Sequence, residues 1–219
     1  LVQKLVRTGF RTNNVDHCTR LCHASSVAAL LENIGSGAVT ASFAECRNAE
    51  AIIVIGANPT VNHPVAATFI KNAAQRGARL YVLDPRGQHL DRYATASLRF
   101  TPGSDVAMLN AMINVIITEG LYDAAYVAAH TEGFEELRAR TAATTPEAMA
   151  PICGIDVATL REVARGYAVA NSAMIFWGMG ISQHTHGTDN SRCLISLALL
   201  TGNVGRAGTG LHPLRGQNN

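Results

Sequence analysis

The sequence predicts an α/β fold: a Rossmann-like, mostly parallel sheet with helices on both of its faces. Short apolar runs, typical of strands buried on both faces, occur at residues 51–55, where the run is β-branched, and at residues 79–83 and 173–177. The first two runs flank a segment with helical spacing at residues 64–75. Together these three segments make a βαβ unit of ordinary length, which implies parallel strands joined by a right-handed crossover.

Composition narrows the class of protein. The chain has 219 residues, of which 47% are apolar and 16% charged, so one large domain or two small ones can bury a sizeable core. Its formal net charge of +2 gives no reason to expect nucleic acid or an anionic membrane as a partner. No apolar run reaches the length of a membrane span.

Helix-capping residues and glycines that end helices indicate where the other elements lie. A first helix lies at the N-terminus and Gly9 closes it. A second helix covers residues 25–33, with Ser25 or Ser26 as its cap and Gly35 as its end.

After the second strand, an apolar stretch at residues 96–100 predicts a third one. A Gly-rich tail without a further element ends the chain at residues 202–216. The remaining helices are expected at residues 43–48, 106–118, 123–129, 133–142, from 145 onward, 156–169 and 188–201.

Residues 16–23 place Cys22 directly before His23, next to the expected start of a helix. A cysteine near a helix N-terminus feels the positive end of the dipole, which favours its thiolate. A thiolate suits a soft metal or a nucleophilic attack, and the neighbouring imidazole titrates near neutral pH. The alternative is an unreactive buried thiol beside a surface histidine.

The five cysteines show no disulfide framework, because their number is odd and the chain is long. A reducing compartment, the cytoplasm, fits them better. No C-x-x-C occurs, so neither a zinc pattern nor a complete iron–sulfur pattern is present.

Polar residues follow each expected strand, at the sheet edge where ligands of such folds bind. Asp84 ends the second strand, where an acid accepts hydrogen bonds from a ribose or base, and Arg86 beside it suits a phosphate. Residues 103–105 precede a helix start, which offers free N–H groups to an anion. Gly178 and Gly180 form G-x-G, but the full dinucleotide fingerprint and the P-loop are both absent.

Each of these loops also has a purely structural interpretation, because Gly, Asp and Pro are ordinary turn residues. Asp105 would then be only a helix cap. His184 and His186 resemble a metal pair, but residues two apart cannot share a helix face, so we expect loop or cap positions. Core packing is expected for Met108, Met112, Met174 and Met179.

Residues 15–27 resemble the metal-ligating segment of molybdenum- and tungsten-containing formate dehydrogenases, members of the molybdopterin oxidoreductase family. The resemblance covers nearly the whole chain. The other matching segments, in the family's order, are residues 55–59 with 63–64, 83–86, 103–105, 131–135, 177–180, 200–205 and 213–219.

The resemblance implies roles for individual residues. Cys22 matches the cysteine or selenocysteine that binds molybdenum or tungsten, His23 matches the histidine proposed to move the proton, and Arg215 matches the arginine that orients the formate carboxylate. A guanidinium suits a carboxylate because it binds both oxygens at once. The residues that the resemblance assigns to a molybdopterin guanine dinucleotide are Gly56, Asn58, Asp84, Pro85, Arg86, Gly103, Asp105, Gly178, Met179, Gly180, Gln183 and Gln217.

Full-length relatives carry two such dinucleotides on one metal, a 4Fe–4S cluster in an N-terminal domain, and a C-terminal barrel. Neither the cluster motif nor the barrel is expected here. The resemblance therefore implies a central domain at residues 18–217, preceded by a lead-in at residues 1–17, within a longer chain. The intact enzyme is expected to oxidise formate and to pass electrons to electron-transfer subunits or to an iron–sulfur or flavin partner.

Three alternatives to this interpretation remain: a domain of another molybdopterin enzyme such as a nitrate reductase, a non-catalytic nucleotide-binding module, and a Cys–His hydrolase. The last lacks an evident orienting acid and a nucleophile-elbow motif. Under the favoured interpretation we expect the 219-residue chain alone to be inactive and largely free of metal.

Overall fold

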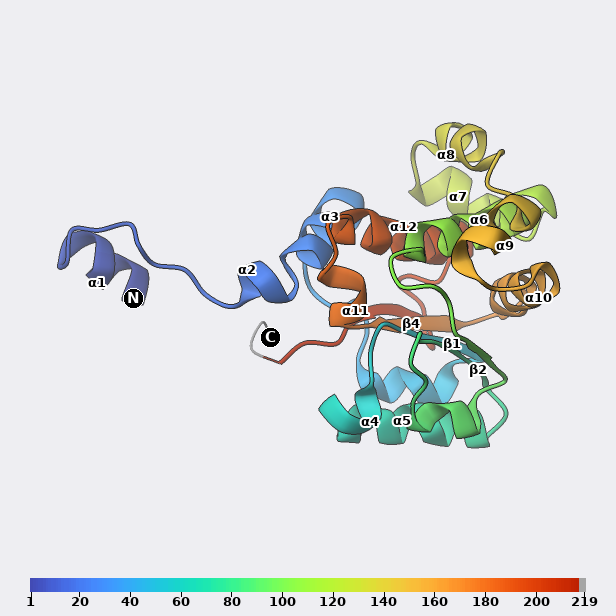
Figure 1. The fold of residues 1–219 in the computed structure, drawn as a ribbon, viewed down its shortest axis with the longest axis horizontal. Coiled ribbons are helices and arrows are strands. Elements are labelled where there is room, and N and C mark those ends of the chain that lie inside the picture. Colours follow the sequence, from blue (N-terminus) through green and yellow to red (C-terminus); the bar gives the residue numbers. More distant parts are fainter. Residues whose placement is uncertain (217–219) are drawn as a thin grey trace.

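The computed structural model describes residues 1–216 and contains a five-stranded sheet in the order β3-β2-β1-β4-β5 (Figure 1). All neighbouring strands pair in parallel, so the predicted fold class is confirmed. The strands are β1 (Ala51–Ile55), β2 (Arg79–Leu83), β3 (Ala96–Leu98), β4 (Ala173–Trp177) and β5 (Gly210–Pro213). The helices are α1 (Val2–Thr8), α2 (Thr19–Cys22), α3 (Ala24–Ile34), η1 (Phe43–Asn48), α4 (Pro59–Asn62), α5 (Pro64–Gln75), η2 (His89–Tyr93), α6 (Asp105–Thr118), α7 (Ala124–His130), α8 (Phe134–Thr141), α9 (Pro146–Cys153), α10 (Val157–Ala168), α11 (Met179–Ser182) and α12 (Gly187–Leu200).

The centre of the sheet is the pair β1 and β4. Every residue of both strands is buried, which explains why their sequences are uninterrupted apolar runs. Ile53 pairs with Tyr81 on one side and Ile175 on the other. From β1 the chain proceeds outward to β2 and β3, whereas β4 and β5 extend the opposite side, so the strand order reverses between β1 and β4. This reversal is the switch point at which such sheets bind ligands.

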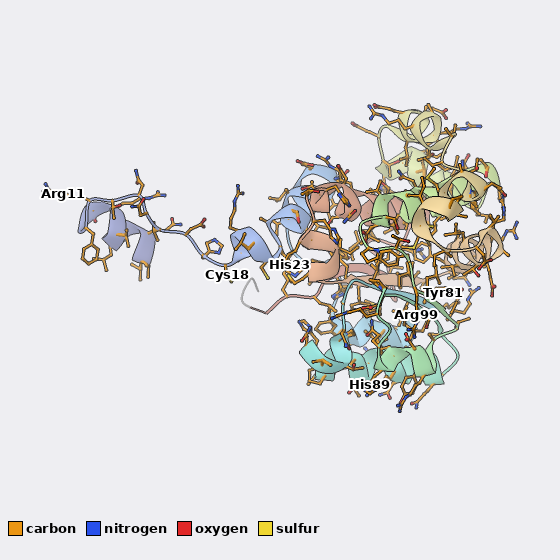
Figure 2. All side chains as sticks on the ribbon, viewed as in Figure 1. Arg11, Cys18, His23, Tyr81, His89 and Arg99 are labelled. Carbon is orange, nitrogen blue, oxygen red and sulfur yellow. The ribbon has the colours of Figure 1, made fainter. Side chains whose placement is uncertain are left out.

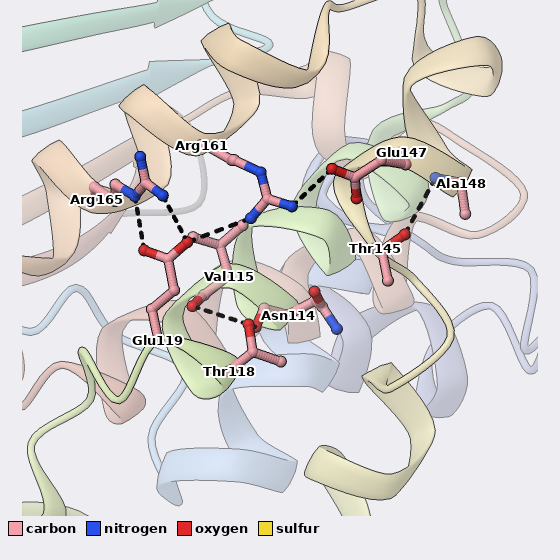
Figure 3. A network of polar contacts seen from close by, with 9 residues as sticks. All are labelled: Asn114, Val115, Thr118, Glu119, Thr145, Glu147, Ala148, Arg161 and Arg165. Carbon is pink, nitrogen blue, oxygen red and sulfur yellow. Dashed lines mark hydrogen bonds and ion pairs between the residues drawn. The ribbon is translucent and has the colours of Figure 1, made fainter.

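Helices cover both faces (Figure 1). One face carries α3, α6, α10 and α12, and its core contains Trp177 and Tyr167. The other face carries η1 and α5, packed over Ile52, Val54 and Phe176. The exposed ends of α6 and α10 are joined by ion pairs, in which Glu119 contacts the guanidinium groups of Arg161 and Arg165 (Figure 3).

Several helix ends agree with the sequence. Gly35 ends α3 in the left-handed conformation, with φ of 72°. Asp123 and Asp156 cap α7 and α10 through their side chains. The expected cap at Ser25 or Ser26 is wrong, because α3 begins at Ala24 and both hydroxyls bond elsewhere, to the residues of α11 and α12 described below.

The C-terminal part differs most from the sequence-based prediction. The Gly-rich tail contains β5, an edge strand that pairs with β4. Its sequence, Gly-Leu-His-Pro, has only one aliphatic residue, and a proline is tolerated at an edge because its missing N–H is not needed there. The third strand, β3, is shorter than the apolar stretch that predicted it.

The N-terminal segment stands apart from this body. Helix α1 contains no buried residue, and Figure 1 shows it extending away from the sheet on an irregular connection. The division into a lead-in at residues 1–17 and a domain at residues 18–217 stays a prediction. No helix within residues 1–216 is both long and apolar enough to cross a membrane.

Candidate cofactor and metal site

A cavity of about 320 Å³ lies at the carboxyl edge of the sheet, beside the switch point. The loops after β1, β2, β3 and β4 all contribute to its wall, so the expectation that the strand ends meet around one space is confirmed. Of the residues predicted to hold a cofactor, ten line this cavity: Gly56, Asn58, Asp84, Pro85, Arg86, Gly103, Asp105, Gly178, Met179 and Gly180.

The floor of the cavity is made by two loops whose backbones touch. The N–H of Gly180 donates to the carbonyl of Gly56 at 2.9 Å. A Cβ at Gly180 would lie 2.7 Å from Gly56 Cα, and one at Gly178 would lie 2.8 Å from Gly56 O. Glycine is therefore needed at these positions for β1 and β4 to end side by side.

Asp84 and Arg86 form one side of the cavity. The Oδ1 of Asp84 accepts the backbone N–H groups of Arg86, at 2.8 Å, and of Gly87, at 3.2 Å, which fixes the turn after β2. The guanidinium of Arg86 is exposed and makes no ion pair within the described part of the chain. A cation held at the rim in this way is free to meet a phosphate.

Asp105 forms the opposite side and is only 1% exposed. Neither of its carboxylate oxygens has a hydrogen-bond partner among residues 1–216, so Asp105 is not the side-chain cap that one interpretation expected. His184 and His186 face it, with ligand atoms of all three residues within 4.8 Å of one another. Burial raises the pKa of Asp105, and the two histidines oppose that rise.

This grouping was missed in the sequence. His184 and His186 do lie between α11 and α12, and His186 occupies the N-cap position, so their loop and cap positions are confirmed. Their proximity to Asp105 results from packing of α11 and α12 near the start of α6, and no local spacing signals it.

A second group of side chains lies where the segments at the two ends of the chain meet. Cys22 ends α2, and its Sγ lies 3.6 Å from Met179 Sδ at the cavity wall. Arg215 follows β5, and its positive charge lowers the pKa of both Cys22 and His23. The structure therefore brings together the three residues predicted to be catalytic.

Arg215 is partly buried and leaves part of its guanidinium free. One terminal nitrogen donates to the carbonyl of Gly37, while Nε has no partner within the described residues. Its backbone carbonyl oxygen accepts a hydrogen bond from Nε2 of His63 at 2.9 Å. The surroundings of Arg215 are therefore those of a half-buried side chain and not of a solvated tail residue.

The structure contradicts the predicted preference of Cys22 for its thiolate form. Burial raises the pKa of the Cys22 thiol, Cys18 raises it further, and Arg215 lowers it. Cys22 is the last residue of α2 rather than a residue in the first turn of α3, so it does not gain from that helix N-terminus.

His23 is buried, with 0% exposure, which contradicts the alternative of a surface histidine. Its Nδ1 lies 3.0 Å from Ser182 Oγ and its Nε2 lies 2.9 Å from Leu214 O. Burial lowers the pKa of His23. Figure 2 shows its position where α3 joins the body, whereas Cys18 lies on the projecting segment.

Gln183 does not line the cavity; its side-chain amide donates to Leu21 O at 3.0 Å and ties the loop after α11 to α2. Gln217 lies outside the described residues. Met179, assigned both to core packing and to the cofactor loops, lines the cavity, whereas Met108, Met112 and Met174 are buried as predicted.

The fold and this site define the chain as a Rossmann-like α/β domain with a cavity at its switch point and a Cys–His–Arg group beside it. Residues 1–218 match the model of the Molybdopterin oxidoreductase family, and the chain belongs to that family. Membership implies a molybdopterin cofactor that carries molybdenum or tungsten.

Within this family, the chain is similar to formate dehydrogenases. The chain is 45% identical, over its whole length, to formate dehydrogenase H from Escherichia coli (strain K12), and covers 31% of it. It is 43% identical, again over its whole length, to the F420-dependent formate dehydrogenase subunit alpha from Methanocaldococcus jannaschii, and covers 32% of it. Acetylene hydratase from Pelobacter acetylenicus has a similar structure, with a TM-score of 0.75 and 29% identity over 85% of this chain and 25% of that one. The resemblance to formate dehydrogenases is thus confirmed, and the chain spans about a third of the length of these two curated relatives.

Proposed function

We propose that this chain is the dinucleotide-binding domain of a formate dehydrogenase, which oxidises formate to CO2 at a molybdenum or tungsten centre. The observation that carries the proposal is the convergence of Cys22, His23 and Arg215 beside the cavity, from segments near opposite ends of the sequence. The identity to formate dehydrogenases over the whole chain supports it.

The residues around the cavity suit a guanine dinucleotide form of the cofactor. Guanine presents two adjacent donors, N1–H and the 2-amino group, and the two unpartnered oxygens of Asp105 are the matching acceptors. Adenine presents an acceptor at N1 and would leave one carboxylate oxygen facing another lone pair. Arg86 at the rim suits the negatively charged diphosphate.

The chain's own groups divide the work at the other end of the site. Cys22 offers a soft sulfur ligand, which suits molybdenum or tungsten. When bound, the metal cofactor supplies a two-electron acceptor for the reaction. Arg215 has an unpartnered Nε and a full positive charge, with which it would hold and orient the carboxylate of formate.

Although His23 is next to Cys22 in the sequence, its imidazole does not contact the Cys22 sulfur. Because its two ring nitrogens contact Ser182 and Leu214, neither is directed to the sulfur in this conformation. We propose that His23 holds the proton after it has left formate only once one of these hydrogen bonds has opened.

The test uses the longer enzyme that carries this domain. Cys22→Ser should abolish formate oxidation, and Arg215→Lys should raise the KM for formate, because a point charge replaces a bidentate donor. Cys18→Ser, four residues earlier, is the matched control and should keep activity. Unchanged formate oxidation in Cys22→Ser would contradict the proposal, and reduction of nitrate without oxidation of formate would favour a nitrate reductase-like enzyme. We also propose that the longer enzyme passes its electrons to an iron–sulfur or flavin partner. Co-purification with the longer enzyme would identify this partner.

A further inference from the structure

We propose that Ser182 and Ser26 are positioning residues that lock the His23 ring in the Nε2–H form and so hold Arg215 in place relative to Cys22. The functional meaning of this lock rests on the proposed function, whereas its existence does not.

The ring nitrogen Nε2 must carry a proton, because its partner is the carbonyl oxygen of Leu214 at 2.9 Å and a carbonyl only accepts. In a neutral imidazole the other nitrogen then has a lone pair and accepts. Its partner, Ser182 Oγ at 3.0 Å, therefore donates to Nδ1. The ring is fully buried and both of its hydrogen-bond partners are uncharged, which fits the neutral form of the imidazole.

The Ser182 hydroxyl has one proton and donates it to His23. Its oxygen therefore accepts a hydrogen bond from Ser26, whose Oγ lies 2.6 Å away. Ser26 in turn accepts from the indole N–H of Trp177, at 2.8 Å, and an indole N–H only donates. The chain of bonds thus runs in one direction, from Trp177 through Ser26 and Ser182 to His23. Ser191 Oγ lies 3.0 Å from Ser26 Oγ and 3.0 Å from Gly187 O.

All members of this chain are buried, so water does not replace a lost bond without cost. The chain also crosses the fold: His23 precedes α3, Ser182 ends α11, and Leu214 follows β5. Through Leu214 the imidazole fixes the backbone next to Arg215, while its own backbone follows Cys22. The lock therefore sets the distance between the proposed metal ligand and the proposed formate-binding group.

The direct test is the tautomer of His23, read from long-range ¹H–¹⁵N spectra of the 219-residue chain with ¹⁵N-labelled histidine at pH 7. His23→Gln assigns the signal among the eight histidines. We expect the wild type to show a single Nε2–H tautomer with a hydrogen-bonded Nδ1. Ser182→Ala should shift the Nδ1 signal and broaden it, and Ser182→Thr should restore it.

Ser25→Ala is the matched control, because the Ser25 hydroxyl donates to the backbone carbonyl of Ser182 at 2.8 Å but lies outside the chain to the ring. It should leave the His23 signal unchanged. An Nδ1–H or averaged tautomer in the wild type overturns the proposal, as does an unchanged signal in Ser182→Ala. A variant that fails to fold does not remove the wild-type measurement.

The functional consequence is measured in the longer enzyme. Loss of one positioning hydrogen bond should lower kcat/KM for formate by about tenfold in Ser182→Ala, mainly through a higher KM because the displaced group, Arg215, binds formate, and Ser182→Thr should restore it. If the enzyme does not oxidise formate at all, the proposed function fails while the tautomer still tests the lock. If formate is oxidised equally well by Ser182→Ala, the positioning role is refuted and the proposed function stands.

Discussion

His212 should make the stability of the domain depend on pH. It lies in β5, is 2% exposed, and packs in a cluster of three rings, with the ring centroids of Phe43 and Phe176 at 5.3 and 4.8 Å from its own. Its Nε2 has no partner among residues 1–216. Burial in this aromatic cluster lowers the pKa of His212 from 6.5 to about 4, because a charged ring would lose its hydration there.

The sign and size follow from linkage. Between pH 6.5 and 4 the unfolded chain binds the proton and the folded chain does not, so His212 stabilises the fold fully above pH 6.5 and loses that contribution as pH falls. The whole effect is about 3 kcal/mol, and between pH 7.5 and pH 5 it amounts to roughly 2 kcal/mol.

The assay is urea unfolding of wild type and His212→Phe at both pH values. Phenylalanine keeps the aromatic stack, and any packing cost of the larger ring is the same at both pH values and cancels. The variant should lose about 2 kcal/mol less than wild type on going from pH 7.5 to 5. His89→Phe, at an exposed position visible in Figure 2, should lose as much as wild type. An equal loss in wild type and His212→Phe would refute the reasoning.

Three further outcomes are expected. Asp105→Asn should weaken binding of GDP to the chain by about tenfold and leave ADP binding nearly unchanged, measured by calorimetry; equal losses would contradict guanine recognition. Gly180→Ala should destabilise the fold by about 2 kcal/mol or more, since its Cβ would lie 2.7 Å from backbone of the facing loop, whereas Gly216→Ala meets no atom within 4 Å and should be neutral in thermal unfolding. Arg215→Ala should slow alkylation of Cys22 by iodoacetamide at pH 8, because loss of the positive charge raises the pKa of the thiol; a faster reaction would contradict their proximity.

The central sheet was predictable because its signal is local. β1, β2 and β4 are buried and consist almost entirely of apolar residues, many of them β-branched or aromatic. The five residues of each strand are therefore enough to predict it. β5 was not predictable in this way. Its residues are held by pairing with β4 and by a covering loop, in which Thr40 N–H donates to Leu211 O at 3.2 Å. Tertiary context decides such a strand, and its own side chains do not.

The sequence predicts which loops form the site, but it does not predict the contacts between side chains from distant elements. The βαβ pattern alone places the strand ends at one edge of the sheet, and so predicts that Gly56, Asp84 and Gly178 lie close together. The approach of His184 and His186 to Asp105 depends on how α11 and α12 pack. The serine hydroxyls near His23 looked like helix caps, because the sequence offers no signal for a partner on a distant helix.

Strand β5, which the sequence did not predict, positions part of the proposed site. β5 pairs with β4 up to the match of Pro213 with Trp177, and the Leu214 N–H then donates to Trp177 O at 2.7 Å. This places Leu214 O against His23 and directs Arg215 to the same edge as the loop after β4. Any change that unpairs β5 should therefore separate Arg215 from Cys22 even though neither residue is altered. The anion-binding group thus depends on the outermost strand of the sheet, while the cofactor loops depend on its centre.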